Sequence, residues 1–187
     1  MERTADKGGE KQGVVTPRVY VASLADYNNG ELHGAWIDAD QDPDELRAEI
    51  QNMLGRSLEP VAEEWAIHDY EGFGPFQVGE YESLEVVSAV ALGIAECGLA
   101  FAAYASWAGT SEEALRQFDN CFLGLWPSLD AYARDMASEF EWDSALEQLP
   151  ESMRPYVDID YEALVRDLDS EVTTIAGPGG VYIFREP

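Results

Sequence analysis

Few side chains in this 187-residue sequence are of the types that perform acid–base, nucleophilic or metal chemistry at neutral pH. The histidines are His33 and His68, and the cysteines are Cys97 and Cys121. Each histidine lies inside an expected strand with no motif around it, which is more typical of a structural or surface histidine than of a general base. The four residues do not stand at the short spacings that zinc ligand pairs use, so the sequence does not favour a zinc site.

Two short motifs resemble ligand-binding loops but each lacks a required residue. Residues 38–42 (Asp-Ala-Asp-Gln-Asp) begin like a calcium loop with Glu49 at position twelve, but Pro43 stands at position six, where that loop needs glycine. Residues 177–180 (Gly-Pro-Gly-Gly) lack the lysine of a phosphate-binding loop and precede an expected strand, so they are interpreted as a turn. Pairs of carboxylates of the kind that glycosidases use are expected in any chain this acidic, so their presence does not indicate such an enzyme. We predict a protein that is not an enzyme, with no catalytic residue, metal or cofactor.

The sequence is strongly acidic but not that of a disordered tail. It has 37 Asp and Glu residues against 11 Lys and Arg, a net charge of -26, with 46% hydrophobic and 11% aromatic residues. Such apolar content is enough to form real cores. The charge excludes proteins that bind nucleic acid by neutralising phosphates, and proteins that bind anionic membrane surfaces, because both mechanisms need clustered Lys and Arg.

The negative charge is spread over the whole chain after a neutral start. Residues 1–16 balance three acids with three bases, and we expect them to be a disordered leader. Residues 17–78 carry -10, residues 79–123 carry -6 and residues 124–187 carry -10, with no lysine. Repulsion between this many like charges destabilises a compact state. We therefore expect that other interactions offset this cost or that the function of the protein uses the charge. Solubility and adaptation to high salt are the alternative explanations for the charge, and genomic base composition is an alternative explanation for arginine without lysine.

Some arginines stand four residues after an acid on an expected helix, the spacing of same-face ion pairs. The expected pairs are Glu112–Arg116, Asp130–Arg134 and Glu162–Arg166.

The first segment, 17–78, is expected to form a β-β-α-β domain. Residues 18–24 and 32–37 are strand-like and flank Asn28-Asn29-Gly30, which predicts a hairpin with a tight turn. Asp42-Pro43-Asp44-Glu45 is a strong helix start, and Gly55 is placed to end that helix. Residues 64–70 are the third expected strand.

The middle segment, 79–123, is expected to be a helical domain. Ser83 is placed to cap its first helix, and Thr110 with Glu113 forms a capping box before the last one, so residues 83–122 are interpreted as all helical. The most apolar window, 86–108, is interrupted by Glu96 and glycines and lacks flanking Lys or Arg, so we interpret it as a buried helical hairpin.

The last segment, 124–187, is expected to be an α+β domain. Its first helix starts at Ser128 with a buried face through Phe140, and a shorter helix is capped by Asp160. A β-hairpin, 171–175 with 181–184, closes the chain. No apolar segment follows the N-terminal charges, so no signal peptide is predicted and the protein is expected to be soluble and cytoplasmic.

Several ordered blocks of sequence are similar to one known family. In the first segment they are residues 20–30 (YVASLADYNNG), 32–38 (LHGAWID) and 64–73 (EWAIHDYEGF). Near the C-terminus they are residues 149–151 (LPE), 156–158 (YVD), 166–168 (RDL) and 179–184 (GGVYIF). These blocks resemble the ArdA antirestriction proteins, and the likeness covers nearly all of the chain after the leader, with the middle matching least clearly.

The resemblance implies an elongated, three-part, acidic homodimer that mimics DNA. Proteins of this kind occupy the DNA-binding groove in the methyltransferase core of Type I restriction–modification enzymes, protect incoming mobile DNA and have no catalytic residues. Duplex DNA carries one charge per about 1.7 Å of axis, so -26 matches roughly 44 Å, or about 13 base pairs. The expected partners are therefore that enzyme and a second copy of the chain, without direct contact to nucleic acid or membrane.

The acids expected to form the DNA-mimic surface lie on predicted helix faces and loops. They are Asp38, Asp40, Asp44, Glu45, Glu49, Glu112, Glu113, Asp119, Asp130, Asp135, Glu139, Glu141, Asp143, Glu147, Glu151, Asp158, Asp160, Glu162, Asp167 and Asp169. Taken singly, each is best explained as a solvated surface charge, and the hypothesis concerns the array. The candidates for an apolar dimer contact, which could equally fill a small core, are Trp126, Tyr132, Phe140, Trp142 and Tyr156.

Two other functions compete with the mimic hypothesis. One is an acidic decoy or chaperone for other basic DNA-binding proteins, such as histone-like or silencing proteins. The other is a salt-adapted metabolic protein, against which the missing catalytic constellation argues.

Overall fold

The computed structural model describes residues 16–186 and divides the chain into two compact units. One unit extends to Ala102 and the other begins at Ala103, so the boundary falls within helix α4 (Leu99–Ala108). Each unit contains a three-stranded antiparallel sheet with helices, which confirms the mixed α+β class. The expected leader lies outside the described residues except for Thr16, and the division into three domains stays a prediction.

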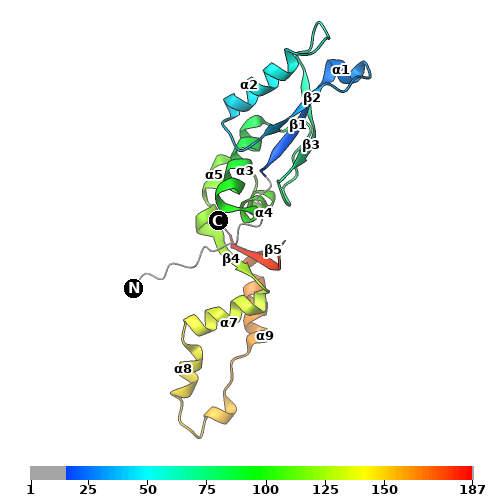
Figure 1. Cartoon of the computed structure of the whole chain (residues 1–187). Helices are drawn as coiled ribbons and strands as arrows, with labels where there is room; N and C mark the ends of the chain where they lie inside the picture. The colour runs from blue at the N-terminus through cyan, green and yellow to red at the C-terminus, as the bar shows by residue number, and fades with distance from the viewer. Residues whose placement is uncertain (1–15, 187) are drawn as a thin grey trace. The chain divides into compact units, whose positions relative to one another are not determined.

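The first unit is a sheet with helix α2 across one face (Figure 1). Its strands pair in the order β2-β1-β3. The elements are β1 (Arg18–Ser23), α1 (Leu24–Asn28), β2 (Gly34–Asp38), α2 (Pro43–Leu54), β3 (Trp65–Glu71) and α3 (Leu84–Cys97).

The connection between β1 and β2 is longer than the expected tight turn. The strands do pair antiparallel, but Leu24, expected in the first strand, begins the short helix α1. Ser23 caps α1, since its Oγ accepts a hydrogen bond from the Asp26 amide at 3.4 Å. The second strand then starts at Gly34 rather than at Leu32.

Helix α2 begins as its sequence predicts and is tied to α3. Asp42 Oδ1 accepts a hydrogen bond from the Asp44 amide at 2.8 Å, and Pro43 is the first helical residue. Gly55 ends the helix, but in right-handed conformation, so its freedom as a glycine is not needed there. Arg47 of α2 contacts Glu85 of α3 at 3.0 Å, which joins the two helices in the same unit.

The apolar window 86–108 forms two helices, as expected, and no single long one. α3 ends at Gly98, whose φ of +71° suits glycine, and α4 follows at once. A Cβ atom on Gly93 would lie 2.2 Å from the Phe101 ring, so glycine permits this close approach. Within the described part of the chain, none of the helices combines the length and hydropathy needed to cross a bilayer.

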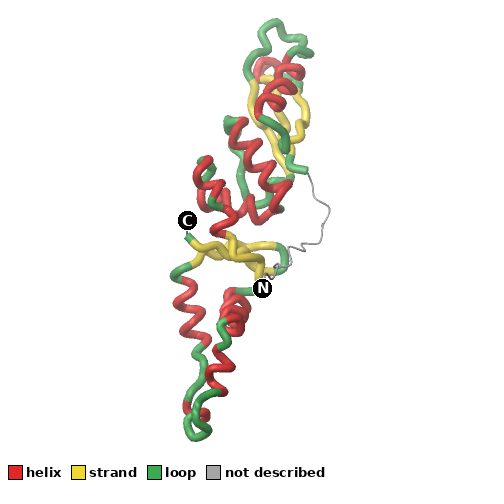
Figure 2. The backbone as a smooth tube through the Cα atoms, turned by 90° about the vertical axis from the view of Figure 1, so that its left-hand side faces the viewer, coloured by secondary structure: helices red, strands yellow, loops and turns green. Residues whose placement is uncertain are grey.

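The second unit pairs its strands in the order β4-β6-β5, with α7 and α9 side by side (Figure 2). Its elements after α4 are α5 (Glu112–Arg116), α6 (Phe118–Cys121), β4 (Phe122–Trp126), α7 (Leu129–Glu139), α8 (Trp142–Glu147), the 3-10 helix η1 (Arg154–Tyr156), α9 (Tyr161–Asp169), β5 (Val172–Gly177) and β6 (Gly180–Arg185). The closing hairpin, β5 with β6, is confirmed.

Two local expectations in this unit are wrong. Phe122 was expected in a helix but begins strand β4, and it pairs with Phe184 of β6. The cap of α5 is Ser111 rather than Thr110, since Ser111 Oγ accepts a hydrogen bond from the Ala114 amide at 3.2 Å.

An aromatic cluster forms the core beneath this sheet. The Tyr104 ring lies 5.5 Å from both Phe118 and Phe184, and all three side chains are buried. The Tyr104 hydroxyl lies 3.0 Å from the Ala114 carbonyl oxygen and 3.6 Å from Cys121 Sγ. Burial, together with the contact to Cys121, raises the pKa of Tyr104 to about 12, so this hydroxyl stays neutral.

The buried face of α7 is narrower than predicted. Ala133 and Ala137 are fully buried, whereas Tyr132 is only half-buried. Phe140, expected at the end of the buried face, follows the helix and is 65% exposed. The second unit therefore relies on small residues where α7 packs.

Asp26 is the one buried carboxylate among the residues that the structure describes, at 3% exposure. Ser57, in the loop after α2, donates a hydrogen bond to Asp26 Oδ2 at 2.7 Å. Hydrogen bonds with Ser23 and then Ser57 hold the pKa of Asp26 below its ordinary value despite burial. The Leu24 amide also donates to the Glu64 carbonyl oxygen at 3.0 Å, so the start of α1 and the loop before β3 are held together.

We expect Ser57→Ala to destabilise the protein in a pH-dependent way. The folded pKa of Asp26 lies below its ordinary value of 3.8, so this carboxylate stabilises the fold above that pH and less as pH falls through the folded pKa. The decrease in unfolding free energy caused by Ser57→Ala should therefore be largest at pH 7 and become smaller below about pH 4. Urea unfolding measured across pH 3 to 7 checks this.

The matched control is the same substitution in an Asp26→Asn background. There the effect of Ser57→Ala should not vary with pH. A pH-independent effect in the background that keeps Asp26 would contradict the assignment.

Candidate functional site: the exposed carboxylates

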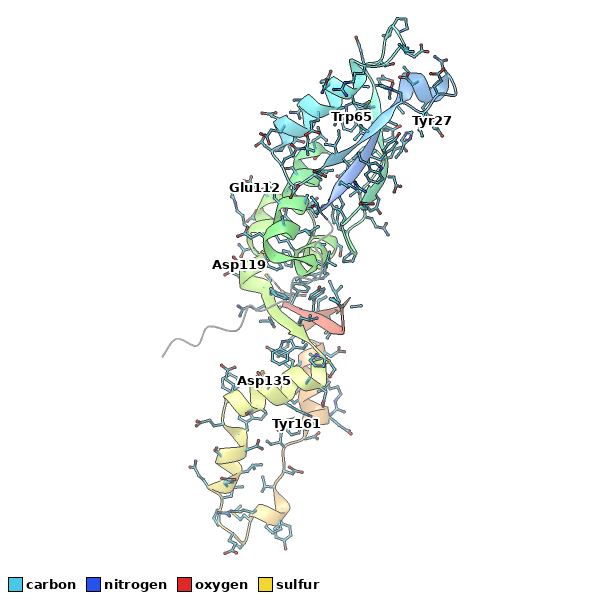
Figure 3. All side chains as sticks on the ribbon, viewed as in Figure 1. Tyr27, Trp65, Glu112, Asp119, Asp135 and Tyr161 are labelled. Atoms are coloured by element: carbon cyan, nitrogen blue, oxygen red, sulfur yellow. The ribbon has the colours of Figure 1, made fainter. Side chains whose placement is uncertain are left out.

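The twenty predicted acids lie on the surface. Nineteen of them are exposed and Asp40 is half-buried. Glu112 on α5, Asp119 on α6 and Asp135 on α7 are labelled in Figure 3 and belong to the second unit. The expected exposure therefore holds for nineteen of the twenty acids, and whether they act as one binding surface stays a prediction.

Helix periodicity places these charges away from the buried face of each helix. In α9, Leu168 is buried while Glu162, Asp167 and Asp169 are exposed. In α7, Ala133 is buried while Asp135 lies on the exposed face. The same amphipathic pattern that forms each core therefore directs the carboxylates to solvent.

Part of the positive charge is neutralised within each unit. Glu112 pairs with Arg116 on α5, and Asp130 pairs with Arg134 on α7 at 2.8 Å, which confirms two of the three expected helical pairs. Among the described residues, Glu162 and Arg166 form no ion pair, contrary to the third expectation.

The first unit adds three ion pairs that were not among the expected ones, and two of them join different elements. Arg18 of β1 pairs with Glu71 of β3 at 2.5 Å, and Arg47 contacts both Asp44 and Glu85. Arg18 also lies over the Trp36 ring, 4.8 Å from its centroid. Register across a sheet brings Arg18 and Glu71 together, which a single-sequence pattern does not show.

Several acids have local structural roles. Asp160 caps α9 by accepting a hydrogen bond from the Ala163 amide at 2.9 Å, as predicted. Asp158 accepts from the Ile159 amide at 2.8 Å, and Glu49 accepts from Gln41 Nε2 at 3.0 Å. These carboxylates stabilise the local structure through hydrogen bonds and also contribute to the negative surface charge.

Further exposed acids were not selected from the sequence. Glu63, Glu64, Asp69 and Glu80 are exposed and lie on or beside β3. Strand alternation is a signal only for Asp69, which lies within β3, and the β1–β3 register shift between Tyr20 and Val21 breaks that alternation. The acidic surface of the first unit is thus larger than expected.

The histidines and cysteines have structural surroundings. His33 Nε2 lies 2.8 Å from the Met53 carbonyl oxygen at the end of α2, and the His68 ring contacts the Tyr27 ring edge-on at 4.8 Å. Cys121 is buried, forms no disulfide and contacts the Tyr104 hydroxyl. No group of three or more His, Cys, Asp or Glu side chains in residues 16–186 is arranged to hold a metal ion.

The five aromatic residues proposed for a dimer contact differ in exposure. Trp126 donates a hydrogen bond to the Leu123 carbonyl oxygen at 3.1 Å and contacts the Tyr132 ring, so these two pack within the unit. Trp142 is half-buried. Phe140 and Tyr156 are 65% and 87% exposed.

Taken together, the described residues define a class of protein: a small α+β protein with a polyanionic surface. A family model described as Antirestriction protein (ArdA) matches residues 19–182. The chain therefore belongs to the ArdA family of antirestriction proteins, which are inhibitors rather than enzymes. A search of curated proteins found no match.

One acid of the surface has a strained backbone. Glu141, between α7 and α8, has φ 55° and ψ 33°, and it is the non-glycine residue with positive φ among those described. A side chain in this left-handed region costs of order 1 kcal/mol. Glu139, two residues earlier, ends α7 in ordinary helical conformation.

We expect glycine to be better tolerated at 141 than at 139. Glu141→Gly relieves the left-handed strain, whereas Glu139→Gly removes a good helix former, and both remove one exposed carboxylate. The unfolding free energies of the two variants should differ by about 1 kcal/mol in favour of Glu141→Gly. Urea denaturation measures this, and equal losses would contradict the assigned backbone strain.

Proposed function

We propose that this protein is a DNA mimic that occupies the DNA-binding groove of a Type I restriction–modification enzyme, in its methyltransferase core. By excluding DNA from that groove it protects incoming mobile DNA from cleavage. The observation that carries the proposal is the surface array of exposed carboxylates in a chain of the antirestriction family. The target groove is basic because it binds phosphates, so it complements this array.

The spacing of the carboxylates is compatible with mimicry of a phosphate backbone. An α-helix rises about 1.5 Å per residue, so acids four residues apart on one face are about 6 Å apart. Asp135 and Glu139 on α7 have that spacing, and both are exposed. Phosphates on one DNA strand rise about 3.4 Å per step. The protein therefore resembles DNA in its density of negative charge. It has no bases that the enzyme could recognise.

Charge reversal of an array should abolish inhibition where single changes do little. A variant with Asp135, Glu139, Asp143, Glu147 and Glu151 changed to Lys should lose at least about a hundredfold in inhibition, because attraction to a basic groove turns into repulsion. Each single Lys variant should stay within about threefold of the unchanged protein. The measurement is DNA cleavage and methylation by a Type I enzyme during titration with each variant.

The same titration with heparin separates specific from general polyanion binding. Inhibition by the protein at concentrations well below those of heparin supports a specific complex. Inhibition only at heparin-like concentrations, or full inhibition by a folded five-Lys variant, would contradict the mimic proposal. Binding of a histone-like protein with equal affinity would favour the decoy function instead.

We further propose that the protein acts as a homodimer through an apolar contact of the second unit. Two acidic protomers must meet where charge is locally low, because like charges across an interface are costly. Phe140 and Tyr156 are the large exposed aromatics among the predicted contact residues. Met153, 50% exposed, adds apolar surface next to η1.

We expect the double variant Phe140→Ser/Tyr156→Ser to shift the protein toward monomer. Light scattering during gel filtration measures the mass, and the dissociation constant should rise about tenfold or more because two large apolar side chains lose their contact. The matched control is Leu58→Ser, which removes a 92% exposed apolar side chain from the first unit and should leave the mass unchanged. A dimer unaffected by the double variant would place the interface elsewhere.

A further inference from the structure

The two edges of the first sheet differ in their contacts. On the β3 side, the Ile67 amide donates a hydrogen bond to the Glu80 carbonyl oxygen at 2.9 Å, so the segment after β3 contacts that edge at this point. On the β2 side, no strand among the described residues continues the sheet, since β2 is the end of the order β2-β1-β3. Native proteins usually protect such an edge, because its free backbone groups can pair with another chain.

The register shows which backbone groups of β2 face outward. The Ser23 amide bonds the His33 carbonyl oxygen, and the Ala39 amide bonds the Pro17 carbonyl oxygen. In an antiparallel pair, alternate residues bond the neighbouring strand, so the N–H and C=O groups of Gly34, Trp36 and Asp38 point away from β1. Gln41 Nε2 bonds the Asp38 carbonyl oxygen at 2.7 Å, which agrees with that direction.

A cleft of about 260 Å³ lies along this open edge. Its inner wall is β2 from Gly34 to Ile37, and its outer wall is the second half of α2, with Glu49 and Asn52, together with Arg56 just after the helix. Addition of a strand to a sheet edge beside a helix is a known mode of peptide recognition, in which backbone hydrogen bonds supply affinity and the groove selects side chains. The edge and the cleft together have the form of such a site.

The charges around the cleft indicate the occupant. Glu49 lies on its wall, Asp38 and Asp40 lie at the end of β2, and Glu45 lies one turn earlier on α2. Arg56 is the one cation among the lining residues. An extended segment rich in Lys and Arg complements this surround, whereas a second copy of this edge would add the same carboxylates to an already acidic site.

We propose that a basic, extended segment of the target enzyme pairs with β2 in this cleft. The inference rests on the proposed function and adds a contact that involves backbone hydrogen bonds rather than charge alone. The outward groups of Gly34 and Trp36 bond the partner strand, and the carboxylates near Asp38 receive its basic side chains. This contact gives the complex a register and an orientation that a diffuse polyanion does not have.

Hydrogen exchange of the Gly34 and Trp36 amides tests the pairing directly. In the free full-length protein these amides should exchange fast, and in the complex with an inhibited Type I enzyme they should exchange at least about tenfold more slowly. Unchanged exchange in an inhibited complex would overturn the proposal. Slow exchange already in the free protein would also overturn it, because another segment or copy of this chain would then occupy the edge.

Two matched variant pairs test the contact by inhibition. Trp36→Pro removes the outward amide, and Trp36→Val removes only the indole, so the proline variant should inhibit about tenfold more weakly than the valine variant. Asn52→Trp fills the cleft, and Gln51→Trp adds the same bulk on an exposed neighbour that does not line it. The Asn52 variant should inhibit about tenfold more weakly than the Gln51 variant, with equal thermal stability.

The outcomes separate the two proposals. Equal inhibition by Asn52→Trp and Gln51→Trp, with normal inhibition by the unchanged protein, would overturn the β2 contact and leave the mimic function standing. If the unchanged protein inhibits no Type I enzyme, the mimic function fails and the β2 contact fails with it.

Discussion

Like-charge repulsion is the constraint on which the rest of this structure depends. A net charge of -26 on 187 residues opposes any compact state, and burial of a carboxylate costs further free energy unless hydrogen bonds replace its water. The fold leaves its carboxylates at the surface, and Asp26, the buried one among the described residues, has serine partners. Ion pairs such as Asp130–Arg134 neutralise part of the surface charge locally, and the excess of acids over bases leaves the surface negative.

The sequence predicted those features that depend on local chemistry. The caps at Asp42, Ser83, Ser128 and Asp160 were correct because a side-chain oxygen bonds an amide two or three residues away. Strand β4 was missed because Phe118 and Phe122 have helical spacing, while the partner that makes Phe122 a strand residue, Phe184, lies far along the chain. Exposure of the acids followed from amphipathic patterns, but ion pairs across the sheet and the open edge of β2 depend on tertiary register.

The two proposed sources of binding have different physical origins. Attraction between the carboxylates and a basic groove is long-ranged, fast to steer association and weakened by salt. Strand pairing at β2 is short-ranged, directional and far less sensitive to salt, because it consists of backbone hydrogen bonds in a cleft beside α2. A protein with both would approach its target as a polyanion and then dock in one orientation.

The most direct test of the central claim is the salt dependence of inhibition by the unchanged protein. The inhibition constant is measured as the dissociation constant of the complex between this protein and a Type I enzyme, without competing DNA. Its logarithm is plotted against the logarithm of the NaCl concentration. If the carboxylate array replaces DNA phosphates, inhibition should weaken by at least about a hundredfold between about 50 and 200 mM salt, because bound anions are released from the groove. An inhibition constant that changes less than about twofold over this range would contradict DNA mimicry.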